Sequence, residues 1–169
     1  MKVIRNAYQA EQTLLENEGY TLIKKVLVAV DGSANSLRAL DFGLDLAEKF
    51  SASVLILTVF QLPAMYTSPD DPAVYSSSRA AFINDLQKLH QETLAKAVDE
   101  AKRLKPSLEV ATELKEGEPA AQIVETAKEG GFDVIVVGHR GLSRLSEVFL
   151  GGVSERVAHL AKCAVVIVK

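Results

Sequence analysis

Short apolar segments recur along the chain and alternate with longer amphipathic ones. Most of the short segments are apolar at consecutive positions, which is typical of strands covered on both faces in a parallel sheet. The expected strands are residues 25–31, 53–60, 108–114, 134–137 and 163–168. The third of them alternates apolar and polar residues, which predicts a position near a sheet edge.

The segments between these strands have the apolar spacing of helices. After Ser33, a candidate N-cap, Leu37, Leu40, Leu44 and Ala47 form one apolar face. Further helices are expected from Arg79 to about Pro106 with Leu89 on the apolar side, from Pro119 to Gly130, and from Val153 to Ala161. The alternation predicts one doubly wound, Rossmann-like α/β sheet of five parallel strands, ordered 3-2-1-4-5, with helices on both faces.

Two stretches lie outside this pattern. Residues 1–23 are expected to form an N-terminal extension, either a short helical arm or a partly ordered segment, before one domain spanning residues 24–169. Residues 61–78 contain three prolines and predict a long surface loop. Such a loop serves as a lid or a partner contact, or is simply disordered.

Composition narrows the class of protein. The net charge of −3 and the isoelectric point near 5.7 offer no general attraction for a polyanion, so no nucleic-acid partner is expected. No window has the roughly 18 apolar residues of a membrane span, and the first residues lack the apolar core of a signal peptide. The single cysteine, Cys163, fits a reducing compartment. We therefore expect a cytoplasmic protein that does not contact membranes.

Candidate chemistry gathers where strands end. Gly138 and Gly141 follow the fourth strand, and Gly151 and Gly152 precede the last helix. Glycine backbone beside a helix N-terminus can hold a phosphate, because its N–H groups are accessible and the helix adds partial positive charge. Asp31, after the first strand, would repel phosphate but could accept hydrogen bonds from ribose or hold a cation. Together these groups suggest a nucleotide; the alternative for Asp31 is a turn or capping residue.

The spacing Gly138-x2-Gly141-x9-Gly151, followed by Gly152, Val153 and Ser154, resembles the ATP-binding members of the universal stress protein family. The first and last strands of residues 25–169 resemble that family as well. The resemblance implies that Asp31 faces ribose or a metal such as Mg2+, that Val59 and Val137 face adenine, and that the four glycines line the phosphates of ATP, ADP or AMP. The other candidate ligand residues are Ala29, Ser33, His139, Arg140, Val153 and Ser154.

The chain departs from the family pattern at Gly152, where nucleotide-binding members have a hydroxyl residue. A hydrogen bond to a charged group contributes about 1.5–3 kcal/mol, so its loss would weaken binding about tenfold or more. Ser154 is the candidate to compensate. In the alternative interpretation, the glycines only shape a tight turn and nothing is bound.

Three functions remain open at this point. The leading hypothesis is a regulatory, non-enzymatic, nucleotide-binding protein of the stress response. A slow ATPase is less favoured because the sequence has no Gly-Lys-Ser/Thr element. The third is an assembly module without nucleotide. Because the final strand is apolar from Ala164 to Val168, we expect a homodimer formed through it.

Overall fold

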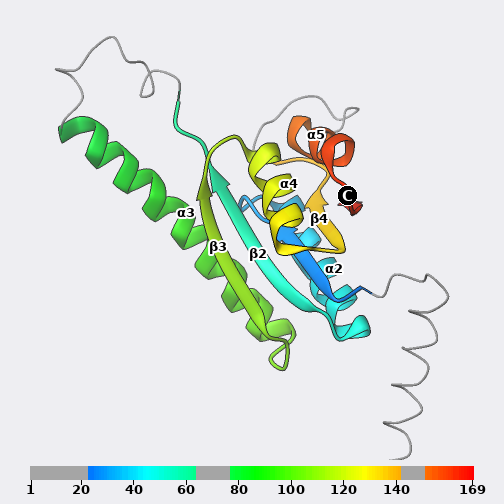
Figure 1. Cartoon of the computed structure of the whole chain (residues 1–169). Coiled ribbons are helices and arrows are strands. Elements are labelled where there is room, and N and C mark those ends of the chain that lie inside the picture. The colour runs from blue at the N-terminus through cyan, green and yellow to red at the C-terminus, as the bar shows by residue number, and fades with distance from the viewer. Residues whose placement is uncertain (1–22, 64–76, 142–150) are drawn as a thin grey trace, which may run out of the picture.

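The computed structural model describes residues 23–63, 77–141 and 151–169, which form one parallel sheet with helices on both faces (Figure 1). The strands are β1 (Lys25–Ala29), β2 (Ser53–Phe60), β3 (Val110–Glu116), β4 (Val134–Gly138) and β5 (Ala164–Val168). The helices are α2 (Ala34–Phe50), α3 (Ser77–Leu104), α4 (Pro119–Gly130) and α5 (Gly152–Leu160). The strand order β3-β2-β1-β4-β5 confirms the predicted fold.

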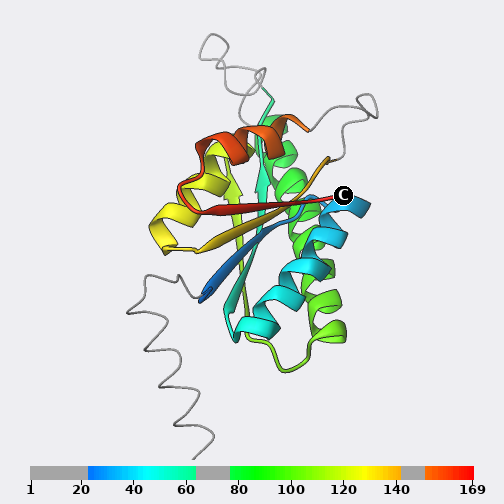
Figure 2. The ribbon, with the colours of Figure 1, turned by 90° about the vertical axis from the view of Figure 1, so that its right-hand side faces the viewer.

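The core has two layers because successive strand residues point to opposite faces. Val26 and Val28 of β1 pack in the cluster under α2 and α3, whereas Leu27 packs in the cluster under α4 and α5. In β4, Val136 and Val137 divide between the two clusters in the same way. Figure 2 shows α2 and α3 together on one side of the sheet and α4 and α5 on the other. Burial on both faces explains the consecutive apolar residues of these central strands.

Local chemistry fixes where the helices begin and end. The Ser33 side chain caps α2 by accepting from the Ser36 backbone N–H at 3.2 Å, as predicted. Glu118 caps α4, directly before Pro119. The C-cap of the same helix is Gly131, which has the left-handed φ of 61° that glycine adopts without strain. No helix in the described ranges combines the length and the apolar character needed to span a bilayer.

Several observed boundaries differ from the expected ones by one or more residues, and the differences in α3, β3 and β1 are the most informative. Helix α3 begins at Ser77, and β3 runs from Val110 to Glu116 rather than over residues 108–114. The strand starts later because Leu108 donates its N–H to the carbonyl of Lys105, which extends the turn after α3. Strand β1 ends at Ala29, although the N–H of Val30 still bonds the carbonyl of Leu57 at 2.9 Å.

Leu89 was expected on the packed side of α3 but is 58% exposed. The helix is longer than the sheet is tall and continues past it in Figure 1, so apolar spacing over its first half does not imply burial. Three stretches lie outside the described residues, namely residues 1–22 of the expected 1–23 extension, residues 64–76 of the 61–78 loop, and residues 142–150.

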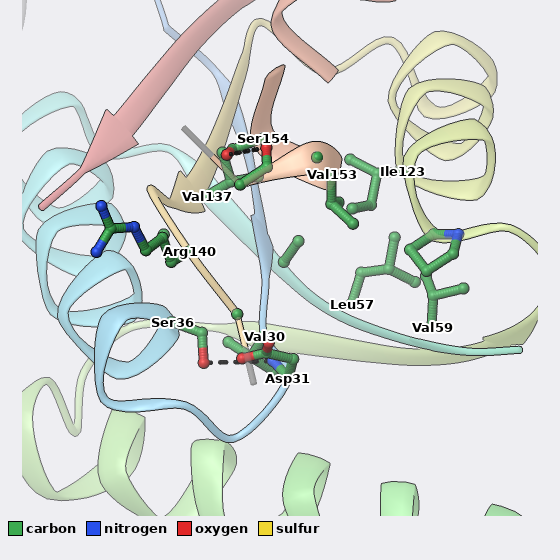
Figure 3. Close-up of a pocket in the computed structure, with 16 residues that line it drawn as sticks. Val30, Asp31, Ser36, Leu57, Val59, Ile123, Val137, Arg140, Val153 and Ser154 are labelled. Carbon is green, nitrogen blue, oxygen red and sulfur yellow. Dashed lines mark hydrogen bonds between the residues drawn. The ribbon is translucent and has the colours of Figure 1, made fainter. Parts of the chain in front are cut away.

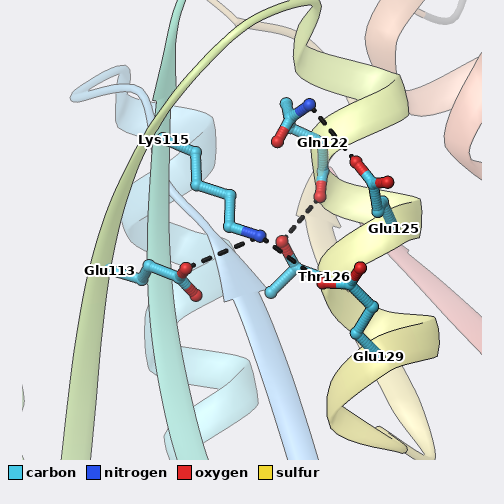
Figure 4. A network of polar contacts seen from close by, with 6 residues as sticks. All are labelled: Glu113, Lys115, Gln122, Glu125, Thr126 and Glu129. Carbon is cyan, nitrogen blue, oxygen red and sulfur yellow. Dashed lines mark hydrogen bonds and ion pairs between the residues drawn. The ribbon is translucent and has the colours of Figure 1, made fainter.

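The two sheet edges differ in chemistry. On β3, Lys115 lies between Glu113, at 3.5 Å, and Glu129 of α4, at 4.0 Å (Figure 4). At the opposite edge, β5 has the sequence Ala-Val-Val-Ile-Val, and its valines and isoleucine are only partly buried. The β3 edge is therefore charged and the β5 edge apolar.

At the amino end of the strands, Asp133 joins β1 to β4. Its Oδ2 atom accepts the backbone N–H groups of Lys24 at 2.7 Å and Lys25 at 2.9 Å. The Asp133 N–H in turn donates to the carbonyl of Lys25 at 3.0 Å. These bonds hold the start of β1 against the turn between α4 and β4.

Candidate functional site

A cleft lies at the carboxyl ends of β1, β2 and β4, between the first turns of α4 and α5 (Figure 3). The winding of a sheet with this strand order reverses between β1 and β4, and ligands of open α/β sheets bind at such a point. The cleft is lined by Ala29, Val30, Asp31, Ser36, Leu57, Val59, Pro119, Ile123, Val137, Gly138, Arg140, Gly141, Gly151, Gly152, Val153 and Ser154.

One half of the cleft is apolar. Leu57 and Val59 come from β2, Ile123 from α4 and Val153 from α5, and Figure 3 shows these side chains gathered on one side. Val137 contributes from β4. This half can accept a flat apolar group such as a heterocyclic base, because contact with apolar side chains removes its faces from water.

Asp31 begins the polar half. Its Oδ1 atom accepts the backbone N–H of Ser33 at 3.0 Å, which fixes the carboxylate at the start of the turn into α2. A Cβ added to Gly141 would collide with its Oδ2 atom. Gly141 therefore lies directly against the carboxylate, and a side chain at this position would require Asp31 to shift.

The first turn of α5 completes the polar half. Gly151 is the N-cap and has no side-chain capping bond; its own N–H donates to the carbonyl of His139 at 2.8 Å. The helix begins at Gly152, and the N–H groups of a first helical turn have no intrahelical acceptor. These donors and the helix dipole favour an anion at the Gly152 end of the cleft.

Arg140 adds a positive charge to this half, and Figure 3 shows its guanidinium on the opposite side of the cleft from Ile123. The cleft thus combines an apolar side, a carboxylate and an anion-binding helix N-terminus. These are the kinds of group that a base, a ribose and a phosphate would contact.

The universal stress protein family model matches residues 22–169 of the chain. The chain belongs to this family. Among its relatives, the universal stress protein YxiE of Bacillus subtilis (strain 168) is 37% identical over 150 residues, which cover 88% of this chain and all of YxiE.

Solved structures of universal stress proteins share the fold. One, described as a universal stress protein in complex with cAMP, is 29% identical, with a TM-score of 0.66 over 88% of this chain and 99% of the other. The universal stress protein from Archaeoglobus fulgidus in complex with dAMP is 23% identical, with a TM-score of 0.60 over 88% of this chain and 100% of the other. The second likeness, at lower identity, supports the fold alone.

The structure brings together nearly all the site residues expected in this universal stress protein. The exceptions are Ser33 and His139, which do not line the cleft. The Ser33 hydroxyl caps α2 and its N–H holds Asp31, so it acts on the cleft through that carboxylate. His139 takes part through its backbone. Its carbonyl accepts a hydrogen bond from the Gly151 N–H, and its N–H donates to the Val168 carbonyl at 2.7 Å.

The structure also defines the departure at Gly152. Among the described residues, no atom outside the glycine's chain neighbours and its own helix backbone lies within 4 Å of a Cβ built on Gly152. The Ser154 hydroxyl is buried and donates to the carbonyls of His139, at 3.0 Å, and Gly151, at 2.9 Å. Because its proton already has acceptors, Ser154 in this arrangement fastens α5 to the preceding turn rather than presenting a donor to the cleft.

Sequence reasoning missed five lining residues, namely Val30, Ser36, Leu57, Pro119 and Ile123. Pro119 and Ile123 could have been found. In a doubly wound fold the helix that follows β3 starts at the carboxyl edge of the sheet, and Pro119 at its first position marks that start. The inward direction of Leu57 depends on strand register, which the apolar run does not specify.

Proposed function

We propose that this universal stress protein binds an adenine nucleotide in the cleft and acts as a regulatory protein of the stress response. The observation that carries the proposal is that one cleft contains apolar side chains, a glycine-lined helix N-terminus and the Asp31 carboxylate. The cAMP complex of a relative at 29% identity supports an adenine nucleotide as the ligand class.

In the proposed arrangement the adenine lies between Val59 and Val137, with Ala29 beneath it. The ribose hydroxyls donate to Asp31. The phosphates then lie beyond the carboxylate, near Gly141, Gly151 and Gly152, where backbone N–H groups and Arg140 offset their charge. Because Gly141 lies against the Asp31 carboxylate, phosphate groups placed nearer Gly151 and Gly152 meet less repulsion from that carboxylate.

ATP is the proposed ligand, with ADP and AMP as the alternatives. Mg2+ could accompany it, because this ion is commonly held by one or two carboxylates together with phosphates and water. Asp31 would be the protein ligand. In the described part of the chain, no group of three or more His, Cys, Asp or Glu side chains could hold a metal by itself, which fits a cation that depends on the nucleotide.

We propose a binding rather than a catalytic role, with ATP hydrolysis slow or absent. Phosphoryl transfer depends on charges and a base aligned on the terminal phosphate, and the sequence lacks the Gly-Lys-Ser/Thr element that commonly supplies part of this set. We propose a cytoplasmic location, which is consistent with a single cysteine, Cys163. Burial raises the pKa of the Cys163 thiol, which favours its protonated form.

An assembly module without a ligand is the second candidate. It is favoured by Gly152, which supplies no hydroxyl, and by Ser154, whose proton is already used within the protein. Nucleotide binding separates the two functions directly.

Calorimetric titration of the full chain with ATP, ADP, AMP and adenosine tests the proposal. Gly141→Val should weaken binding at least about tenfold, because its side chain displaces Asp31 and fills the approach to the turn. Asp31→Ala should weaken adenosine and ATP alike through the ribose. Ala158→Val, on the exposed surface of α5, is the control for added volume and should bind as wild type does. If wild-type protein binds none of the four ligands, the nucleotide function is wrong and the assembly module remains.

A further inference from the structure

A single carboxylate joins the two helices that form the apolar wall of the cleft. Glu118 is the N-cap of α4, and its two oxygens accept the backbone N–H groups of Ala120 at 3.2 Å and Ala121 at 2.9 Å. Oε1 also pairs with Nη1 of Arg156 on α5 at 2.9 Å. The same side chain therefore caps the start of α4 and pairs with α5.

The two partners lie within about one helical turn of residues that line the apolar side of the cleft. Pro119 follows Glu118 in the chain, and Ile123 lies about one turn further along α4. On α5, Val153 precedes Arg156 by about one turn. Figure 3 shows Val153 beside Ile123, and both line the cleft, whereas neither Glu118 nor Arg156 does. A change in the separation of α4 and α5 would thus move Val153 relative to Ile123.

We propose that the Glu118–Arg156 ion pair is a positioning device that sets the width of the apolar side of the cleft and so tunes affinity for the base. The inference rests on the proposed nucleotide function and adds residues outside the cleft to it. Arg156 acts only through the wall that it holds, so its contribution should be the same for every ligand with the same base.

The Glu118–Arg156 ion pair is more preorganised than an ordinary surface ion pair. Exposed pairs contribute little, partly because two long side chains must lose freedom to meet. Here the two α4 amides already fix the carboxylate, so only Arg156 must be ordered. The side chains remain 55% exposed for Arg156 and 32% for Glu118, so salt should screen the pair. The expected effect on affinity is therefore modest and depends on ionic strength.

The test compares adenosine and AMP binding to wild type, Arg156→Met, Glu118→Gln and the double variant, by calorimetry at low and high salt. Arg156→Met keeps the apolar stem, and Glu118→Gln keeps an oxygen that can cap α4. Each single variant should weaken both ligands by the same factor, about two- to fivefold at low salt, and high salt should shrink the difference. The double variant should lose no more than the weaker-binding single variant, because both remove one interaction.

Lys162→Met is the matched control, since it removes an exposed cation just after α5 without touching the pair. It should bind both ligands as wild type does. A larger loss for AMP than for adenosine in Arg156→Met would show that Arg156 acts on the phosphate and would overturn the positioning role. Unchanged affinity in all variants, with wild type binding normally, would also overturn it. Failure of wild type to bind at all would instead refute the proposed function.

Discussion

Gly152 is the residue at which this chain differs most informatively from the ATP-binding pattern of its family. No other part of the described chain contacts the position of its missing Cβ, so a serine fits there without displacing a described neighbour. Gly152→Ser should tighten ATP binding by about 1 kcal/mol or more through a new hydrogen bond to phosphate, with adenosine unaffected. Calorimetry on both ligands measures the difference, and equal gains for ATP and adenosine would mean that the phosphates lie elsewhere.

Thr58 is a residue whose environment the sequence does not reveal. It is fully buried on β2, and among the described residues its hydroxyl oxygen has no hydrogen-bond partner. An unsatisfied buried hydroxyl costs about 1–3 kcal/mol. Nothing in an apolar run shows whether a threonine within it is satisfied.

Thr58→Val should therefore raise the free energy of unfolding by about 1 kcal/mol, because valine has nearly the same shape and no polar atom to bury. Urea denaturation measures the change. Thr112→Val, on the exposed side of β3, is the control and should stay within about 0.5 kcal/mol of wild type. A loss of stability in Thr58→Val would reveal a partner for the hydroxyl.

At the scale of elements, the Asp133 side chain adds two hydrogen bonds at the amino end of the backbone ladder that pairs β1 with β4. Asp133→Ala removes the acceptor of two backbone N–H groups and should lower the free energy of unfolding by about 1–3 kcal/mol. Urea denaturation gives the total, and hydrogen exchange should show faster exchange at the amides of Lys24 and Lys25. Asp99→Ala, an exposed position on α3, should leave both measurements nearly unchanged. Unaltered exchange at the Lys24 and Lys25 amides in Asp133→Ala would show that the Asp133 carboxylate does not hold the start of β1.

The elements themselves were predictable where pattern and burial agree. Strands β1, β2 and β4 are apolar at consecutive positions because both faces are covered, and their identity follows from composition alone. Leu89 shows the limit: its spacing is that of a packed residue, but burial requires a partner surface, and α3 extends past the sheet. The start of β3 was misplaced because a turn bond at Leu108 competes with strand pairing.

The candidate site was predictable to the extent that topology determines it. Parallel strands end at one edge, so Asp31, Val59 and Gly138 had to lie close together once the strand order was known. The use of the Ser154 proton could not be predicted, because it depends on where the carbonyls of His139 and Gly151 point. The ion pair of Glu118 with Arg156 likewise needs the packing of α4 on α5.

At the scale of the whole molecule, we expect a homodimer in which β5 pairs with its copy across a two-fold axis. The edge of β5 is apolar, and pairing would cover unpaired backbone groups and partly exposed side chains. Val166→Lys should give monomer or insoluble protein in sedimentation at micromolar concentration. Thr112→Lys places the same charge on the opposite edge strand and should leave the dimer intact. A monomeric wild type would contradict the expectation.

The chemical difference between the β3 and β5 edges also limits how many copies of the protein could associate through strand pairing. A two-fold axis at β5 uses the same surface of both copies and leaves two β3 strands outermost. Each carries the charged side chains Glu113 and Lys115, and charges on an edge strand oppose further strand addition. In that arrangement, association would stop at the dimer. The apolar strand β5 would then mediate self-association without leading to fibres.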